Sequence, residues 1–137
     1  MIRSASIAII VLLTISRVWL HDSGQWNQLE DQDTINWYRA LMQPDVPHAS
    51  CCGEADAWYC DDVYSKHSSL DNQVKTYCRI TDDRPDAPRN RIHIDVGTEF
   101  EIPVSKLEQY KSNPTGHSII FLSRAMYVYC FIMSTGI

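Results

Sequence analysis

Residues 117–133 read HSIIFLSRAMYVYCFIM, and this stretch decides the fold class. Two runs rich in β-branched and aromatic residues, 117–123 and 126–133, lie on either side of a short connection. Runs of this kind are typical of short strands joined by a turn. The second run carries aromatic residues at alternate positions, which share one face of a strand and predict packing in the core or in cross-strand pairs: Tyr127, Tyr129 and Phe131.

The same signature recurs upstream of this stretch. Four further segments rich in Val, Ile, Tyr and Phe are expected as strands, at 56–65, 73–81, 91–96 and 98–104. Turn-forming residues separate the strands, at 68–72, 82–90 and 113–116. About six short strands spaced in this way predict a mainly β fold, built as a small antiparallel sheet or barrel.

One N-terminal α-helix is expected before the strands. From Asp31 onward, apolar residues recur at helical spacing: Ile35, Tyr38, Leu41 and Met42. Asp31 or Asp33 is available as the N-cap, and the helix should end before Pro44 because proline disrupts a helix interior.

The length and composition fit one domain. The chain has 137 residues, of which 45% are hydrophobic and 21% charged, which is ordinary globular composition. We expect a single disulfide-stapled, β-rich domain over residues 21–137.

Residues 1–20 have the features of a secretory signal peptide. They begin with Arg3 and continue with an uncharged apolar stretch. A membrane-spanning helix needs about 20 apolar residues, whereas Arg3 and Arg17 bracket only 13. Leu20 is not the small residue that signal peptidase prefers, so cleavage after Ser16 and retention as a short membrane anchor are both left open.

The charge of the exported part argues against two classes of partner. Without residues 1–20, 10 basic side chains face 17 acidic ones, which leaves a net charge of −7. Nucleic acids and anionic lipid surfaces reward positive charge. We therefore expect no nucleic-acid partner.

Five cysteines follow the apolar segment: Cys51, Cys52, Cys60, Cys78 and Cys130. In an exported chain of this size they are expected to form disulfides. Cys60 and Cys78 fall in two consecutive predicted strands and could face each other across a hairpin, a bridge worth about 3 kcal/mol in the chain-entropy model. One of the two adjacent cysteines would then bridge to Cys130, and the sequence does not decide which one.

Residues 48–56, HASCCGEAD, are the densest group of reactive side chains. A catalytic interpretation makes Cys52 a nucleophile and His117, at the start of an apolar strand, its base, as in a cysteine-dependent peptidase or amidase. Two features oppose it: Cys51 stands where such enzymes carry an aspartate, and an extended segment follows where they carry a long helix.

A metal site is a further alternative. Glu54, Asp56 and His93, together with His117, could form a polar cluster that binds a metal. The paired cysteine spacing of a structural zinc site is absent from the sequence. We therefore expect neither a metal nor a cofactor.

Several motifs together resemble a family of small bacterial exported proteins of unknown function: Ser-Cys-Cys-Gly-Glu-Ala-Asp at 50–56, Asn-Pro-Thr-Gly-His at 113–117, Val-Tyr-Cys at 128–130 and His-Asp-Ser-Gly-Gln-Trp at 21–26. The resemblance covers nearly the whole chain after residue 20. It implies that Cys51, Cys52 and Cys130 recur in the family, with Cys60 and Cys78 as an additional pair. It carries no activity.

These observations predict an exported accessory domain of the cell envelope with a binding or structural role. Its partner would be another envelope protein or a small ligand, and its compartment the periplasm or the exterior. Tethering to the inner membrane through residues 1–20 is the alternative to release. The thiol hydrolase and the metal-binding protein are the competing functions.

Overall fold

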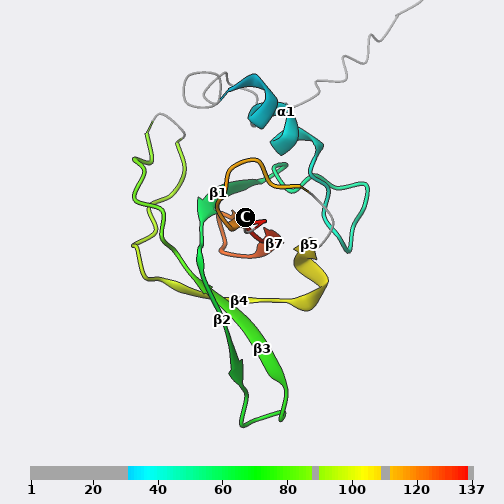
Figure 1. The fold of residues 1–137 in the computed structure, drawn as a ribbon, viewed down its shortest axis with the longest axis vertical. Coiled ribbons are helices and arrows are strands. Elements are labelled where there is room, and N and C mark those ends of the chain that lie inside the picture. Colours follow the sequence, from blue (N-terminus) through cyan, green and yellow to red (C-terminus); the bar gives the residue numbers. More distant parts are fainter. Residues whose placement is uncertain (1–30, 88–89, 109–111, 136–137) are drawn as a thin grey trace, which may run out of the picture.

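The computed structural model describes residues 31–87, 90–108 and 112–135. Its elements, in chain order, are helix α1 (Gln32–Ala40), strands β1 (Ala55–Tyr59), β2 (Asp62–His67), β3 (Val74–Arg79) and β4 (Glu99–Ile102), the 3-10 helix η2 (Val104–Lys106), and strands β5 (Leu107–Glu108), β6 (Ile119–Ser123) and β7 (Val128–Ile132). The predicted mainly β fold with one N-terminal helix is confirmed (Figure 1). The predicted signal peptide or anchor, residues 1–20, lies outside the described residues, within which no helix is long and apolar enough to cross a membrane.

Asp31 is the N-cap of helix α1 and directly precedes its first residue, Gln32. Its carboxylate accepts the backbone N–H groups of Asp33 and Thr34, both at 3.0 Å, so Asp31 rather than Asp33 satisfies the first turn. Tyr38 is buried against the sheet, and Leu41, also buried, is the C-cap. The helix ends at Ala40, two residues before the apolar pattern ends at Met42.

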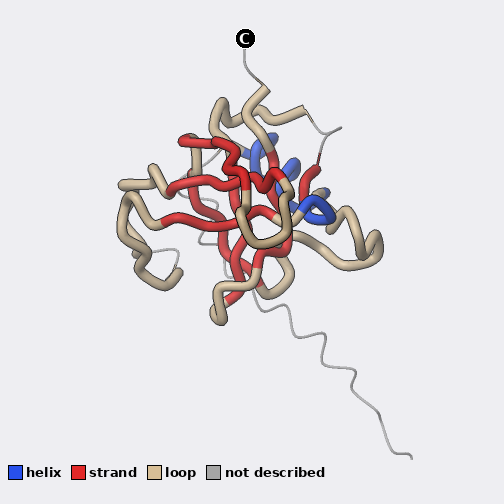
Figure 2. The backbone as a smooth tube through the Cα atoms, turned by 90° about the horizontal axis from the view of Figure 1, so that it is seen from below, coloured by secondary structure: helices blue, strands red, loops and turns tan. Residues whose placement is uncertain are grey.

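The strands form two sheets, in the orders β1-β6-β7-β5 and β2-β3-β4. Strand β6 is buried along its whole length because both faces of its sheet are covered. Ile119 and Phe121 pack toward α1, whereas Ile120 and Leu122 pack toward the second sheet. The molecule is thus a three-layer arrangement of helix, four-stranded sheet and three-stranded sheet, with strands gathered at its centre (Figure 2).

The β2–β3 hairpin extends away from this body, at the opposite end from α1 (Figure 1). Its tip carries Leu70, which is 98% exposed. Strands β2 and β3 pair antiparallel from Asp62 opposite Arg79 to His67 opposite Val74.

The predicted strand 56–65 is in fact two strands. The chain leaves the first sheet at Cys60, whose N–H donates to the carbonyl of Ser118 at 2.8 Å, and enters the second sheet at Asp62. The predicted count of six also lacked β5, which pairs in parallel with β7 over only two residues. A segment that short carries no recognisable periodicity.

One further expected strand does not form, and the expected packing of the alternating aromatic residues in the last strand holds only for Tyr129 and Phe131. Residues 91–96 form an irregular segment rather than a strand, because the side chain of Arg91, and not a backbone ladder, bonds to the neighbouring strand. In β7 a bulge at Tyr129 breaks the alternation, since Phe121 pairs with Cys130 but Leu122 with Val128. Phe131 is consequently in the core while Tyr127 is 70% exposed.

Two disulfides connect separate elements. Cys60–Cys78 joins the corner between the sheets to β3, where the strand partner of Cys78 is Val63 rather than Cys60. Cys51–Cys130 joins the loop after α1 to β7 and leaves Cys52 as a free thiol. Because disulfides persist only where conditions are oxidising, they indicate an extracellular or periplasmic compartment.

Candidate functional site

The Cys52 thiol lies between α1 and the first sheet. Its sulfur is 3.4 Å from the carbonyl oxygen of Tyr38, to which the thiol donates. Burial raises the pKa of Cys52 to about 12, and the negative charge of Asp56 on β1 contributes to this rise. The group is therefore a protonated thiol at neutral pH, which is a weak nucleophile.

His117 is held away from that thiol by a different set of contacts. Its Nδ1 is 2.8 Å from a carboxylate oxygen of Asp61, and its ring stacks on that of Tyr59 with centroids 3.9 Å apart. Thr115 and Asn113 form the turn that presents it: the Asn113 amide donates to the His117 carbonyl at 2.6 Å. In the described contacts, Cys52 and His117 do not form a nucleophile–base pair.

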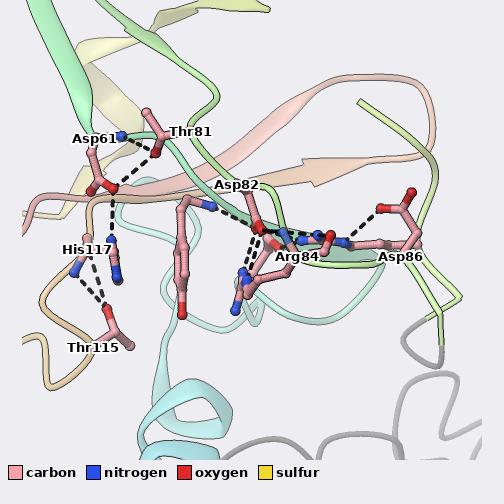
Figure 3. A network of polar contacts seen from close by, with 10 residues as sticks. Asp61, Thr81, Asp82, Arg84, Asp86, Thr115 and His117 are labelled. Atoms are coloured by element: carbon pink, nitrogen blue, oxygen red, sulfur yellow. Dashed lines mark hydrogen bonds and ion pairs between the residues drawn. The ribbon is translucent and has the colours of Figure 1, made fainter. Parts of the chain in front are cut away.

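Tyr59 lies between His117 and Arg84. The Arg84 guanidinium carbon is 3.5 Å from the centroid of the Tyr59 ring. The His117 ring covers one face of the Tyr59 ring at a similar distance. Arg84 therefore lies over the opposite face, because both groups cannot occupy the same one. The arrangement joins the turn at 113–117 to the loop at 82–96, and Figure 3 shows His117 toward one end of the network, Asp86 toward the other and Arg84 between them.

Asp82 is the centre of the network. Its buried carboxylate accepts from Arg84 Nε at 2.8 Å and Nη2 at 2.6 Å, and from Arg91 Nη1 at 2.7 Å. Burial by itself would raise the pKa of Asp82, but the hydrogen bonds from Arg84 and Arg91 outweigh it and hold that pKa well below its usual range. Asp82 is therefore ionised under all ordinary conditions.

Asp82 and Arg91 together cover the outer edge of β1. The Tyr59 N–H donates to Asp82 at 3.1 Å, and Arg91 Nη1 donates to the carbonyl of Ala57 at 2.9 Å. Inside a sheet a neighbouring strand supplies such bonds, whereas an edge strand leaves these backbone groups unpaired. Here one acidic and one basic side chain supply the acceptor and the donor, which protects β1 from pairing with another chain.

The network continues to the surface through Asp86. Asp86 binds Arg91 Nε at 3.1 Å and His93 Nδ1 at 2.8 Å, and His93 Nε2 is 3.1 Å from Asp95. Both ring nitrogens thus face carboxylate oxygens, and only the doubly protonated imidazolium can donate to both. The hydrogen bonds to Asp86 and then Asp95 accordingly raise the pKa of His93.

A surface hollow of about 380 Å³ adjoins the network. Its lining combines four aspartates with two basic and three apolar residues: Asp82, Asp83, Arg84, Pro85, Asp86, His93, Ile94, Asp95 and Val96. Asp83 is exposed and makes no ion pair with the described residues. The volume of the hollow is within the range of small-ligand pockets.

The polar cluster predicted from sequence does not form. Glu54 is exposed in the loop before β1, Asp56 lies near Cys52, and His93 binds Asp86 and Asp95 instead. Among the described residues, no three His, Cys, Asp or Glu side chains are grouped so that they could hold a metal ion.

Sequence reasoning missed the members of the network: Asp61, Asp82, Arg84, Asp86 and Arg91. The interval 82–90 was expected as a proline-containing turn, and charged residues in turns are usually solvated. The one sequence feature that points to the network is the density of opposite charges in this interval. Three aspartates and one arginine fall within 82–86, and Arg91 follows directly after the interval. The pattern gives no indication that Asp82 and Arg91 are buried.

No protein-family model, curated protein or solved structure matches the chain. The resemblance drawn from the motifs therefore stays a prediction. The function has to be argued from the geometry described above.

Proposed function

We propose that the protein is an exported accessory domain of the cell envelope, which binds a partner or a small ligand and performs no thiol chemistry. Its compartment would be the periplasm or the exterior. The two disulfides support this placement, since disulfides persist in the oxidising compartments of exported domains.

The observation that carries the proposal is the state of Cys52. A thiol hydrolase needs a thiolate and a base within hydrogen-bonding reach. Cys52 has neither, because burial keeps it protonated and the described contacts of His117 are with Asp61, Tyr59 and its own turn. Cys51, the other sulfur of the motif, is consumed by the bond to Cys130.

The polar network supports a structural rather than a catalytic role for its charges. The carboxylate of Asp82 receives hydrogen bonds from two guanidinium groups and from two backbone N–H groups. A carboxylate with this many donors has little capacity left for a substrate. Binding would instead use the exposed groups around the network, and the hollow beside Asp83 is the surface we assign to a small ligand.

Thiol mapping of the native, oxidised protein tests the proposal. We expect no alkylation of the folded protein by iodoacetamide at pH 8, and one label at Cys52 after denaturation without reductant. Cys52→Ala should then leave the folded protein's labelling unchanged and abolish the label seen after denaturation. Rapid labelling of Cys52 in the folded protein that disappears in His117→Ala would contradict the proposal and favour the thiol hydrolase.

The location is tested separately, by the intact mass of the protein recovered from an exporting host. A mass that lacks residues 1–16 or 1–20 indicates a released domain. A full-length mass in the membrane fraction indicates the anchored form. A full-length chain with reduced cysteines in the cytosol would overturn export itself.

A further inference from the structure

Strand β2 is an open edge of the second sheet. It pairs with β3 on one side, and within the described residues no backbone bond reaches its other side. Ser65, Lys66 and His67 are exposed, and the hairpin projects away from the body so that no other element covers them (Figure 1). Open strand edges are templates for pairing with another chain.

The register shows which backbone groups face outward. Ser68 N–H donates to the Gln73 carbonyl at 2.8 Å, in the same register as the rest of the hairpin. Bonded and non-bonded pairs alternate in antiparallel strands. The backbone groups of Tyr64 therefore point to β3, and those of Ser65 point outward.

We propose that β2 pairs antiparallel with β2 of a second copy of this chain, with Tyr64 opposite Tyr64 of the second copy. In this register Ser65 N–H donates to the carbonyl of Val63 across the interface, and the twofold axis repeats the bond. The N–H of Val63 is already used, since it donates to the carbonyl of Asp61 at 2.9 Å. The pairing extends the sheet from three strands to six.

Charge selects the partner and the register. With Tyr64 at the axis, Asp62 lies opposite Lys66 of the second copy, and the twofold axis repeats this attraction. Centring the pairing on Lys66 instead would place like charges together, which is unfavourable. The present partners of both side chains, Arg79 and Glu99, are exposed surface pairs, and such pairs exchange partners readily.

The other open edge of the same sheet is protected against the same reaction. By the alternation described above, the backbone groups of Glu99 and Glu101 in β4 point outward. Any antiparallel self-pairing through these residues places glutamates opposite glutamates, and Pro103 ends the strand. The edge of β1 is covered by Asp82 and Arg91, and the edge strand β5 has only two residues. Among the described strands, β2 is therefore the long edge left for a second copy.

The interface is small, which sets the expected strength. Two strands of six residues bury less than the roughly 1,200 Å² of a standard stable interface. We therefore expect dissociation in the micromolar to millimolar range, and dimer content that falls as salt is added. Sedimentation equilibrium of the exported, oxidised protein at low ionic strength measures it.

Two charge variants test the register. Asp62→Lys places a lysine opposite Lys66 twice and should weaken dimerisation about tenfold or more. Asp62→Lys combined with Lys66→Asp restores unlike charges and should return the dissociation constant to within about threefold of the original. Failure of the double variant to recover, with both variants folded, would overturn this register.

A backbone variant tests the edge itself. Ser65→Pro removes the outward N–H, which an edge strand tolerates, and should weaken dimerisation about tenfold or more. Glu101→Pro makes the same change on the β4 edge and should leave dimerisation unchanged. A protein that stays monomeric at millimolar concentration in low salt, or that dimerises equally well after Ser65→Pro, contradicts the proposal.

Discussion

Asp82 and Arg91 form an ion pair in which neither side chain is solvated: Arg91 Nη1 lies 2.7 Å from Asp82 Oδ2, and the two side chains are 0% and 1% exposed. Each also bonds to the backbone of β1, through Tyr59 and Ala57. Buried pairs cost desolvation energy and are weak evidence of added stability, but removing one partner leaves a buried charge uncompensated. The relationship thus predicts a strong asymmetry between single substitutions here and on the surface.

Asp82→Asn should lower the free energy of unfolding by about 3 kcal/mol at pH 7. The substitution keeps the shape but leaves Arg84 and Arg91 without their shared anion. Urea denaturation followed by circular dichroism measures the loss. Asp83→Asn, the same change on the exposed neighbouring residue, is the matched control and should have little effect. Equal urea midpoints for Asp82→Asn and Asp83→Asn would show that the Asp82–Arg91 ion pair makes no net contribution to the free energy of unfolding.

The same carboxylate predicts behaviour in acid. The folded-state pKa of Asp82 is lowered from its ordinary value of 3.8, so its contribution is present above pH 4 and is lost as pH falls below that value. The stability difference between the original protein and Asp82→Asn should therefore shrink as pH falls below about 4. A difference that stays constant to pH 2.5 is the result that contradicts this assignment.

His93 predicts a dependence of the opposite sign. Its pKa is raised in the folded protein above the ordinary 6.5 by Asp86 and Asp95, so its contribution is complete below pH 6.5 and is lost as pH rises through the folded value. The melting temperature of the original protein relative to His93→Gln should fall over that interval. His48→Gln, at an exposed loop position, should show no such change. NMR titration of the His93 ring gives the folded pKa directly.

The strand pattern was predictable where burial follows residue type. Ile119 to Leu122 are apolar because β6 is covered on both faces, and a continuous apolar run of this kind predicts a buried strand. The segment 91–96 has similar apolar residues but forms no strand. The side chain of Arg91 bonds to the edge of β1, where a strand would have formed a ladder of backbone hydrogen bonds. A sequence pattern does not distinguish a charged side chain that points to solvent from one that replaces a strand.

The adjacent cysteines show a second limit of the same kind. Cys51 and Cys52 are equally suitable disulfide partners by residue type, and only the direction of each side chain distinguishes them. Cys51 faces β7 and reaches Cys130, whereas Cys52 points to the carbonyl of Tyr38. The reactivity predicted for Cys52 depended on burial, which spacing along the chain does not reveal.

The two disulfides should differ in their contribution to stability. Cys51–Cys130 closes a separation of 79 residues and Cys60–Cys78 one of 18. In the chain-entropy model the losses are about 4.5 and about 3 kcal/mol. The double alanine variants each remove two buried sulfurs, so the packing loss is matched between them.

Urea midpoints of the two double variants provide the comparison. The variant without Cys51–Cys130 should unfold at the lower urea concentration. The opposite order would mean that the corner at Cys60 contributes more than loop closure, through the junction of the two sheets.

Asn113 predicts a final effect, on the turn that presents His117. Its amide nitrogen donates to the carbonyls of His117 and Met133 at 2.6 and 3.2 Å, while its oxygen accepts from Thr115. Asn113→Asp is isosteric but turns an acceptor toward both carbonyls, and should cost about 2 kcal/mol at pH 7. Protonation restores one donor, so the cost should decrease as pH falls and the carboxyl becomes neutral. Asn72→Asp, in the exposed hairpin turn, is the control. If both variants melt alike at pH 7, the Asn113 amide does not hold the turn, and the position of His117 must depend on Asp61 and Tyr59 alone.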